Sequence, residues 1–445
     1  MLKFGVKNLG RIVSAEVEFA PLTILVGKNN TGKSYLATLM WALAQPSLLS
    51  EVRAYVRRPA WFADFVRPFS GSESRLLVLD RNLIGNAVAF IERAANRKIS
   101  ELLSTVFAMP GFKNTKLKLT AAEGGPYEFI LEPHDRAFQS DDDGVPRVAL
   151  FVRIGSSKQL IYILQQPWFD INSNWLANLI FHEVVGYCLF GALWKAYRRQ
   201  TYIPAARTGI MLALPALVSQ SLSASKPNQP VNMPRPLLEF LSRMTENSGV
   251  RRRRPAPVRD RLRRELLRGQ ISIPQESVPD FRYTPEGLDM ALPLHATSSM
   301  ITELAPFMVA LDNQPGTHHF IFEEPEAHLH LEAQREMARL IARLVKGGTP
   351  VTLTTHSDTF LQQINNLMVL SEHPNREEKM QELGYEKDDL IAPENVKAYE
   401  FCPQKSGTVV VPLENTEDGF VVQTLNATLL SLAKETLSLR SERNG

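Results

Sequence analysis

Apolar and polar residues along the chain fall into blocks that predict both strands and helices. The apolar runs LTILV at 22–26 and FIF at 320–322 are typical of buried strands. The segments 35–109 and 172–200 are instead expected to be mainly helical. The pattern therefore predicts an α/β protein.

Shorter apolar segments predict strands that pair with their neighbours in the sequence. Residues 115–133 are expected to form a hairpin around a Gly-Gly turn, and 148–155 is expected to pair with 158–165. A helix is expected near the end of the chain, within 421–439.

Composition limits the class of protein. The 50 Lys and Arg residues nearly balance 47 Asp and Glu, giving a net charge of +3, so any nucleic-acid surface must be a local patch. The two cysteines, Cys188 and Cys402, exclude a disulfide framework and fit a reducing compartment. The longest apolar run, Val184–Trp194, is too short to span a bilayer, and the first residues do not resemble a signal peptide. We therefore expect a soluble, cytoplasmic protein.

The segment GKNNTGKS at 27–34 has the G-x-x-x-x-G-K-S spacing of a phosphate-binding loop. Glycines let the backbone curl so that successive N–H groups point at phosphates. Lys33 can reach the β- and γ-phosphates, and the Ser34 hydroxyl can bind Mg²⁺. The helix expected directly afterwards would place its positive end at the phosphates. We therefore predict an ATP site formed by Gly27, Lys28, Asn29, Asn30, Thr31, Gly32, Lys33, Ser34 and Tyr35.

A phosphate loop needs an acidic partner on a neighbouring strand, and the segment HHFIFEEPEAHLH at 318–330 supplies one. Glu323 is predicted to hold Mg²⁺, directly or through water. Glu324 is predicted to orient and deprotonate the attacking water. The long separation between Lys33 and Glu323 predicts a head that is split by an insertion or built in two lobes.

Three further features lie where an ATPase would use them. Ser298 and Ser299 can cap a following helix, and a capped helix start can bind a γ-phosphate presented by a second molecule. His356 follows a β-rich run and can contact the γ-phosphate. Arg207 lies just beyond a short strand, and both a structural ion pair and a nucleotide contact stay open for it.

The motifs NNTGKS, EEPEAHLH and TLTTHSD together resemble the ABC-type ATPase heads of the RecF/SMC group, and more narrowly the bacterial ATPases of the overcoming-lysogenization-defect type. The resemblance implies head-to-head dimers, with two ATP molecules held between the phosphate loop of one head and the serine-led signature helix of the other. It implies that Glu324 is the catalytic base, His356 the switch histidine, and Ser298 and Ser299 the contacts to the nucleotide of the partner.

The chain departs from the family pattern in several places. Met300 stands where glycine commonly follows the signature serines, and a side chain there would crowd the approach to the γ-phosphate. Leu331 replaces a usual proline, and the Mg²⁺ acid is Glu323 rather than aspartate. Many relatives carry a C-terminal TOPRIM nuclease, whereas the residues after His356 show no convincing acidic cluster, so the effector is expected to be a separate protein.

A basic run at 251–268 holds nine arginines against Asp260 and Glu265. Three interpretations stay open: a track for nucleic-acid phosphates, a dock for an acidic protein, and a solvated surface. The arginines are Arg251, Arg252, Arg253, Arg254, Arg259, Arg261, Arg263, Arg264 and Arg268.

The sequence thus predicts an α/β fold, an ABC-type P-loop ATPase head in two lobes that is split by a helical insertion. Residues 1–155 and 271–445 are predicted to form the head and 156–270 the insert. Its expected ligands are ATP and Mg²⁺, and its expected partners are a second copy and a separately encoded effector, such as a nuclease, of an antiphage-defence system. A RecF-like DNA repair or replication ATPase is the alternative, and a transporter subunit fits less well.

Overall fold

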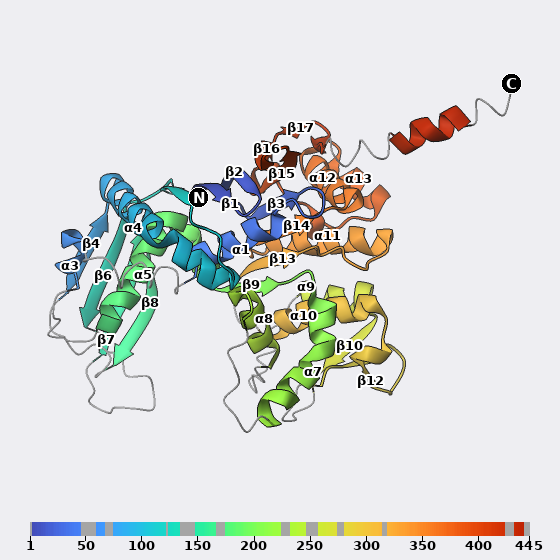
Figure 1. The fold of residues 1–445 in the computed structure, drawn as a ribbon, viewed down its shortest axis with the longest axis horizontal. Helices are drawn as coiled ribbons and strands as arrows, with labels where there is room; N and C mark the ends of the chain where they lie inside the picture. Colours follow the sequence, from blue (N-terminus) through green and yellow to red (C-terminus); the bar gives the residue numbers. More distant parts are fainter. Residues whose placement is uncertain are drawn as a thin grey trace. The chain divides into compact units, whose positions relative to one another are not determined.

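The computed structural model describes most of the chain, and Figure 1 shows its elements. The described residues are 2–45, 59–66, 74–121, 123–133, 147–165, 174–223, 232–245, 257–273, 280–313, 318–422 and 431–439. They form two compact units. Unit 1 comprises Met1–Val6, Ala42–Leu102 and Lys113–Arg198, and unit 2 comprises Lys7–Trp41, Leu103–Phe112 and Arg199–Gly445. These units cut the chain at other places than 155 and 270, and the predicted division of the head stays a prediction.

Unit 1 contains an antiparallel sheet whose strand order is β4-β6-β7-β8. The predicted pairing of the last two strands is confirmed, with Ile154 opposite Ser157 at the turn. Helix α5 (Asn174–Phe190) and the short helix α6 (Trp194–Tyr197) belong to the same unit. The bounds of the strands are Arg75–Leu79, Tyr127–Pro133, Arg147–Ile154 and Ser157–Gln165.

One expectation for this part of the chain is wrong. The segment 115–133 is not a hairpin, because β5 (Lys116–Thr120) pairs with β1 (Lys3–Leu9) whereas β6 pairs with β4 and β7. These strands find their partners outside the local sequence, which local patterns do not encode. The described residues of 35–109 are mainly helical as expected, with the long helix α4 (Arg81–Phe107), although strand β4 precedes it.

Unit 2 is built on a large, mostly parallel sheet in which its strands follow the order β2-β16-β15-β3-β14-β13-β9, with the last residues of β1, Lys7–Leu9, at the β2 end. Strand β3, the apolar run before the phosphate loop, lies between β14 and β15 and is completely buried. The other bounds are β2 Ile12–Glu18, β3 Leu22–Val26, β9 Gln200–Ile203, β13 His319–Glu323, β14 Val351–Thr355, β15 Val396–Gln404 and β16 Gly407–Leu413.

Helices and a small second sheet complete unit 2. Helices α11 and α12 lie side by side against the large sheet (Figure 1). A small antiparallel sheet, β10-β11-β12, precedes helix α10 in the chain. The bounds are α1 Lys33–Leu43, α7 Arg207–Ser223, α8 Arg235–Thr245, α9 Pro257–Arg261, η2 Leu262–Leu267, β10 Gly269–Ser272, β11 Arg282–Pro285, β12 Leu292–Pro293, α10 Ser299–Asn313, α11 Leu331–Lys346, α12 Asp358–Glu372 and α13 Arg376–Leu383.

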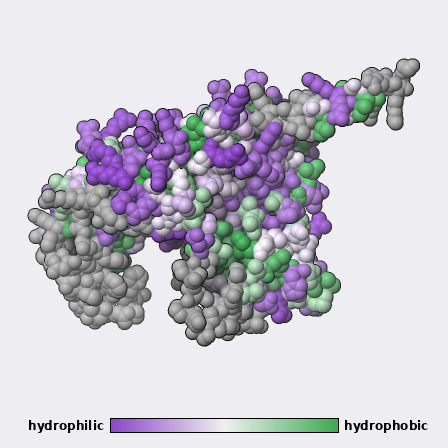
Figure 2. All heavy atoms as spheres, in the orientation of Figure 1, coloured by the Kyte–Doolittle hydropathy of each residue, from purple (hydrophilic) through white to green (hydrophobic). Residues whose placement is uncertain are grey.

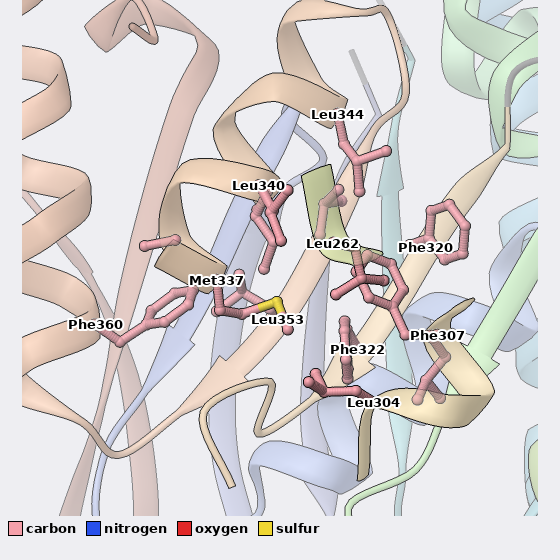
Figure 3. Packing of buried hydrophobic residues seen from close by; sticks show 14 of the residues in the cluster. Leu262, Leu304, Phe307, Phe320, Phe322, Met337, Leu340, Leu344, Leu353 and Phe360 are labelled. Carbon is pink, nitrogen blue, oxygen red and sulfur yellow. The ribbon is translucent and has the colours of Figure 1, made fainter. Parts of the chain in front are cut away.

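The core of unit 2 fastens the helices to the strands that lead into the site. Phe307 of α10 packs against Phe320 and Phe322 of β13, with ring centroids 5.9 and 5.1 Å apart. Figure 3 shows these rings next to Leu262 of η2 and Met337 of α11. Because burying each such side chain contributes about 1.5–3 kcal/mol, this core packs α10 firmly against β13.

One helical stretch is long and apolar enough to cross a membrane by length and composition alone. It spans Ala177–Tyr197 in unit 1, and 78% of its apolar window is buried inside the protein. A core helix of a soluble protein passes the same test, so this burial is compatible with a soluble protein.

The predicted terminal helix is confirmed over residues 431–439. Leu432, Leu437 and Leu439 are exposed on it, and Figure 2 shows apolar residues on this helix.

Candidate nucleotide-binding site

The register of three parallel strands brings the predicted site residues to one edge of the large sheet. Val26 of β3 lies opposite Thr355 of β14, and Thr354 lies opposite Glu323 of β13. Each strand ends there, so the residues that follow meet at the same edge, where ligands of open α/β sheets bind. These residues are Gly27, Glu324 and His356.

The phosphate loop has the backbone shape that its glycines permit. Gly27 has φ 155° and Gly32 has φ 102°, in a region that other residues rarely adopt. A Cβ on Gly27 would also lie 2.9 Å from the Cβ of Phe401. Asn30, at φ 61°, is a residue type that tolerates the left-handed conformation. The backbone conformation of the loop therefore requires glycine at positions 27 and 32.

Lys33 lies inside the curl of the loop. Its Nζ donates to the carbonyl oxygens of Gly27 at 2.7 Å and Lys28 at 2.9 Å. Burial lowers the pKa of Lys33, whereas the nearby charges of Glu324, Glu326 and Glu323 act to raise it. The ammonium group is thus held in the middle of the loop, opposite a group of carboxylates.

The other loop residues divide into exposed and packed ones. Lys28, Asn29, Asn30 and Ser34 are exposed, and Thr31 is buried and donates to the Lys28 carbonyl at 2.8 Å. Exposed side chains and backbone amides are what a phosphate would meet.

Tyr35 is held by packing. Its ring stacks on Phe107 with centroids 4.9 Å apart, and its hydroxyl donates to the sulfur of Met109 at 3.4 Å. The tyrosine side chain therefore belongs to an aromatic cluster, and its predicted role in ATP binding stays a prediction.

Glu323 has the properties expected of a metal ligand. Its side chain is buried, and Oε2 accepts a hydrogen bond from the Ala205 amide at 3.0 Å. Oε1 is buried without a hydrogen-bond partner. Because an unpaired buried carboxylate oxygen is costly, a cation at this oxygen would relieve the cost. Glu323 and the exposed Ser34 hydroxyl thus fit Mg²⁺, although no group of three or more His, Cys, Asp or Glu that could hold a metal occurs among the described residues.

Glu324 and His356 face one another, with Oε1 and Nδ1 3.6 Å apart. The interaction with His356 lowers the pKa of Glu324, against the effect of burial. The same interaction, together with Glu326, whose Oε1 also lies 3.6 Å from Nδ1, raises the pKa of His356 above its ordinary value of 6.5. The pair therefore keeps Glu324 ionised at neutral pH and favours the protonated imidazole.

Glu326 is a site residue that the sequence analysis did not assign. It is buried, and its Oε1 accepts hydrogen bonds from the Thr355 hydroxyl at 2.6 Å and from the His356 amide at 3.0 Å. Its Oε2 is buried without a hydrogen-bond partner. Glu326 thus fixes the backbone of His356. The third acid of the motif EEPE was the available signal for it.

The signature serines begin α10 as expected. The Ser298 hydroxyl accepts from the Ile301 amide at 3.4 Å, so the predicted cap is confirmed. Both Ser298 and Ser299 are exposed. Met300 is partly buried against the core and lines a cavity of about 800 Å³ beside the helix start. Its side chain thus packs inward, which lessens the crowding that its replacement of glycine predicts.

Arg207 is a buried residue that contacts the backbone of the acidic residues of the site. It is fully buried, and its Nε lies 2.5 Å from the carboxylate of Glu303 on α10. Its two terminal nitrogens donate to the carbonyl oxygens of Glu323 at 2.8 Å and Glu324 at 3.0 Å. Of the two interpretations left open by the sequence, the structure shows the ion pair. Glu303 was missed because its partner is distant in the sequence.

His328 and His330 have structural partners. His328 Nε2 lies 3.7 Å from Glu303, and His330 caps α11 by accepting from the Ala333 amide at 3.3 Å.

The arginine run is not a uniform basic surface. Arg251, Arg252, Arg253 and Arg254 lie outside the described residues. Arg261 is buried and bonds Glu336 and Glu386, so it cannot follow a nucleic-acid backbone. The prediction of a phosphate track is therefore wrong for this arginine.

Two other members of the run pair locally. Arg259 lies 3.0 Å from Asp260 and 3.4 Å from Asp312, and Arg264 lies 2.7 Å from Glu265. These contacts neutralise part of the charge that the sequence places in the run.

Arg261 belongs to a buried cluster around Asp389, which we call the Asp389 cluster. Asp389 is fully buried and accepts from Arg339 Nη2 at 2.7 Å and from Arg343 Nε at 2.7 Å. Burial raises its pKa, but these arginines outweigh it and lower the pKa of Asp389. The cluster consists of Arg261, Glu336, Arg339, Arg343, Glu386 and Asp389.

Comparisons with solved structures find SMC heads. The chain is 14% identical to an SMC head bound to the C-winged helix domain of ScpA, with a TM-score of 0.36, covering 93% of this chain and 97% of that one. It is 10% identical to the SMC head domain from Thermotoga maritima, with a TM-score of 0.31 and coverages of 93% and 98%. For the Smc head domain with an extended coiled coil, bound to the C-terminal domain of ScpA derived from Pyrococcus furiosus, the values are 13%, 0.35, 99% and 100%.

Comparisons with known sequences give a match to part of the chain. No curated protein matches the chain significantly. A family model described as the AAA ATPase domain matches residues 296–361. That segment contains the signature helix, the acidic strand β13 and the strand that ends at His356. Together with the phosphate loop at the same sheet edge, this match indicates that residues 296–361 resemble part of an AAA ATPase domain, and the fold around them is α/β.

Proposed function

We propose that this chain hydrolyses ATP to ADP and phosphate at the edge of the sheet formed by β3, β13 and β14. One observation carries the proposal: the strand register brings the phosphate loop, the carboxylates of Glu323 and Glu324, and His356 to the same edge. The buried Oε1 of Glu323 accepts no hydrogen bond, although the Tyr202 hydroxyl interacts with the same carboxylate, and this oxygen supports a cation at this edge.

The residues of the site divide the work. The amides of the phosphate loop and Lys33 bind the phosphates. Ser34 and Glu323 hold Mg²⁺, which supplies neutralisation of the phosphate charge. Glu324, whose carboxylate is ionised at neutral pH, accepts a proton from water as the water oxygen attacks the γ-phosphorus and ADP leaves. His356 then lies where it can sense the γ-phosphate.

The exposed signature serines suggest that a second copy completes the site. Ser298 and Ser299 stand at the exposed start of α10, a place where backbone amides and the helix dipole favour an anion. In the proposal these serines bind the nucleotide held by another copy. ATP binding then closes a dimer, and hydrolysis opens it.

The catalytic part is tested by Glu324→Gln, which keeps the shape of the side chain but removes its basicity. We expect ATP binding to be retained and turnover to fall by roughly 100-fold or more. Glu377→Gln, at an exposed glutamate of α13, is the matched control and should hydrolyse ATP normally. Normal steady-state turnover by Glu324→Gln would remove the assignment of the base.

The assembly part is tested by a bulky substitution in the signature. With ATP bound, Glu324→Gln should show a higher mass in light scattering, and adding Ser299→Tyr should reverse this without loss of ATP binding. Ser156→Tyr, at an exposed turn of unit 1, controls for the size of the new side chain. A monomeric mass in all three proteins would contradict the dimer cycle.

We further propose that the cycle controls a separate effector protein, such as a nuclease, in a bacterial antiphage-defence system of the cytoplasm. The sequence resemblance to ATPases of the overcoming-lysogenization-defect type supports this role. Co-purification of the chain with the product of a neighbouring gene tests it. ATP turnover that rises with DNA, without any protein partner, would favour the RecF-like alternative instead.

A further inference from the structure

We propose that Arg207 and Glu303 form a positioning pair that holds the backbone of the catalytic acids and ties it to the signature helix of the same chain. The inference rests on the proposed ATPase function and extends it. It assigns a purpose to a buried ion pair that does not itself touch the nucleotide.

Arg207 is placed by the fold, not by a flexible loop. Strand β9 pairs in parallel with β13, with Ile203 opposite Phe322, and Arg207 begins the helix that follows β9. Its guanidinium lies over the ring of Phe322, 5.0 Å from the centroid. The arginine therefore reaches the end of the acidic strand from a neighbouring strand of the same sheet.

The guanidinium of Arg207 donates hydrogen bonds to backbone carbonyl oxygens. Nη1 donates to the carbonyls of Pro204 at 3.1 Å and Glu323 at 2.8 Å, and Nη2 donates to that of Glu324 at 3.0 Å. Arginine presents several donors in one rigid plane, so two consecutive carbonyls are fixed relative to each other.

This grip matters because the backbone of Glu324 is strained. Its φ of 45° lies in the left-handed region, which a glutamate adopts only when its surroundings enforce it. The Glu324 amide is held by the Thr354 carbonyl at 2.9 Å, and its carbonyl is held by Arg207. The two contacts fix the direction in which the Glu324 side chain leaves the backbone.

Glu303 connects the grip to α10. Its carboxylate is almost fully buried, lies 2.5 Å from Arg207 Nε, and accepts from the Thr208 hydroxyl at 2.5 Å. Ser299 lies one helical turn before it on the same helix. Because Phe307 also fastens α10 to β13, a displacement at the signature serines moves Glu303, and through Arg207 it moves the Glu324 backbone. Binding of a second copy's nucleotide would thereby adjust the catalytic acid.

The test compares Arg207→Lys and Glu303→Gln with Arg343→Lys, which alters a buried arginine of the Asp389 cluster. Lysine keeps the charge but loses the fork, and glutamine keeps the shape but loses the charge. We expect kcat to fall by roughly 10- to 100-fold in both variants, because small displacements of a reacting group have effects of this size. The affinity for a non-hydrolysable ATP analogue should stay within about twofold, and Arg343→Lys should keep kcat.

One further readout separates positioning from general damage. The double variant should be scarcely slower than either single variant, since the pair acts as one unit.

Wild-type kcat in the folded variants would overturn the proposal. If Arg207→Lys does not fold, Glu303→Gln decides alone. Failure here is distinguishable from failure of the proposed function. Turnover that depends on Glu324 but ignores both variants removes only the positioning pair, whereas turnover that ignores Glu324→Gln removes the ATPase assignment itself.

Discussion

Unit 2 holds two groups of charged side chains, each partly buried, that look similar in composition and differ in how their buried atoms are paired. The sheet-edge cluster (Lys33, Glu323, Glu324, Glu326 and His356) leaves Glu323 Oε1 and Glu326 Oε2 buried without hydrogen-bond partners. In the Asp389 cluster both carboxylate oxygens of Asp389 accept from arginines, and Arg343 Nη2, which makes no hydrogen bond, lies 3.1 Å from the opposite charge of Glu386. Only the sheet-edge cluster contains a glutamate in the left-handed backbone region.

The difference teaches how to tell a site from a structural network. A closed network has compensated the desolvation of its charges within the protein, so its partners are already present. An open network keeps buried polar atoms without hydrogen-bond partners and residues with strained backbone, and a bound ligand can relieve both. Charge content alone does not separate the two.

Breaking the closed network should cost stability and little else. Asp389→Ala leaves Arg339 and Arg343 without their buried counter-charge, and we expect the free energy of unfolding to fall by about 3–5 kcal/mol. Urea denaturation measures this. The neighbouring Asp388→Ala should change it by less than about 1 kcal/mol, because that carboxylate is exposed. A large loss of ATP affinity in Asp389→Ala at temperatures where it is folded would undo the contrast.

Breaking the sheet-edge cluster should instead lower the affinity for ATP and change the stability little. Lys33→Ala removes the charged donor to the phosphates, and we expect ATP affinity to fall by roughly 100-fold, equivalent to about 2.7 kcal/mol. Titration with a fluorescent ATP analogue measures this, with Lys7→Ala as an exposed control. The urea midpoint should change far less than in Asp389→Ala. Unchanged ATP affinity would mean that the loop does not bind nucleotide in the predicted way.

The Glu324–His356 pair predicts a pH dependence. The pKa of Glu324 is lowered from 4.5, so its contribution to stability exists above pH 4.5 and is lost as the pH falls through the folded pKa. The pKa of His356 is raised from 6.5, so its contribution is full below pH 6.5 and is lost as the pH rises through the folded pKa.

In His356→Ala the pKa of Glu324 should rise, and the acid limb of kcat/KM should move to higher pH. A pH–rate series over about pH 4–8 measures the shift. An acid limb that stays in place would show that the imidazole does not set the ionisation of the base.

The smallest effect concerns the arginines that neither cluster absorbs. If Arg251–Arg254 bind nucleic acid, replacing them with alanine should flatten the slope of log affinity against log salt by about one unit for each phosphate that is no longer neutralised. Arg264→Ala is the control, because its guanidinium already pairs with Glu265. If DNA binding is unchanged but a co-purifying protein no longer binds, the run is a dock for an acidic partner. If neither changes, it is a solvated surface.

The sequence predicts those parts of the site that local chemistry determines. The buried strand before Gly27 and the strand that ends at Glu323 are both confirmed, because an apolar run followed by a glycine-rich turn or paired acids admits few other structures. The capped start of α10 follows from the preference of serine for that position.

The remaining features depend on partners that are distant in the sequence. Arg207 shows no local sign that it will meet Glu303 and two carbonyls at the end of β13. Strand β5 looks like half of a hairpin but pairs with β1. Arg261 looks like part of a basic surface but is buried against Glu336. In each case a tertiary contact overrides what the local pattern favours.

The order of strands in the large sheet has a consequence for biosynthesis. The phosphate loop follows β3, which is made early, but both neighbours of β3, β14 and β15, come from the last quarter of the chain. Pairings this distant form late and slowly, since a long stretch must be ordered before they contribute. A nascent or truncated chain that lacks β15 therefore has its phosphate loop on an unsupported edge strand. We therefore expect the phosphate loop to gain its native support on both sides only after synthesis has passed residue 404.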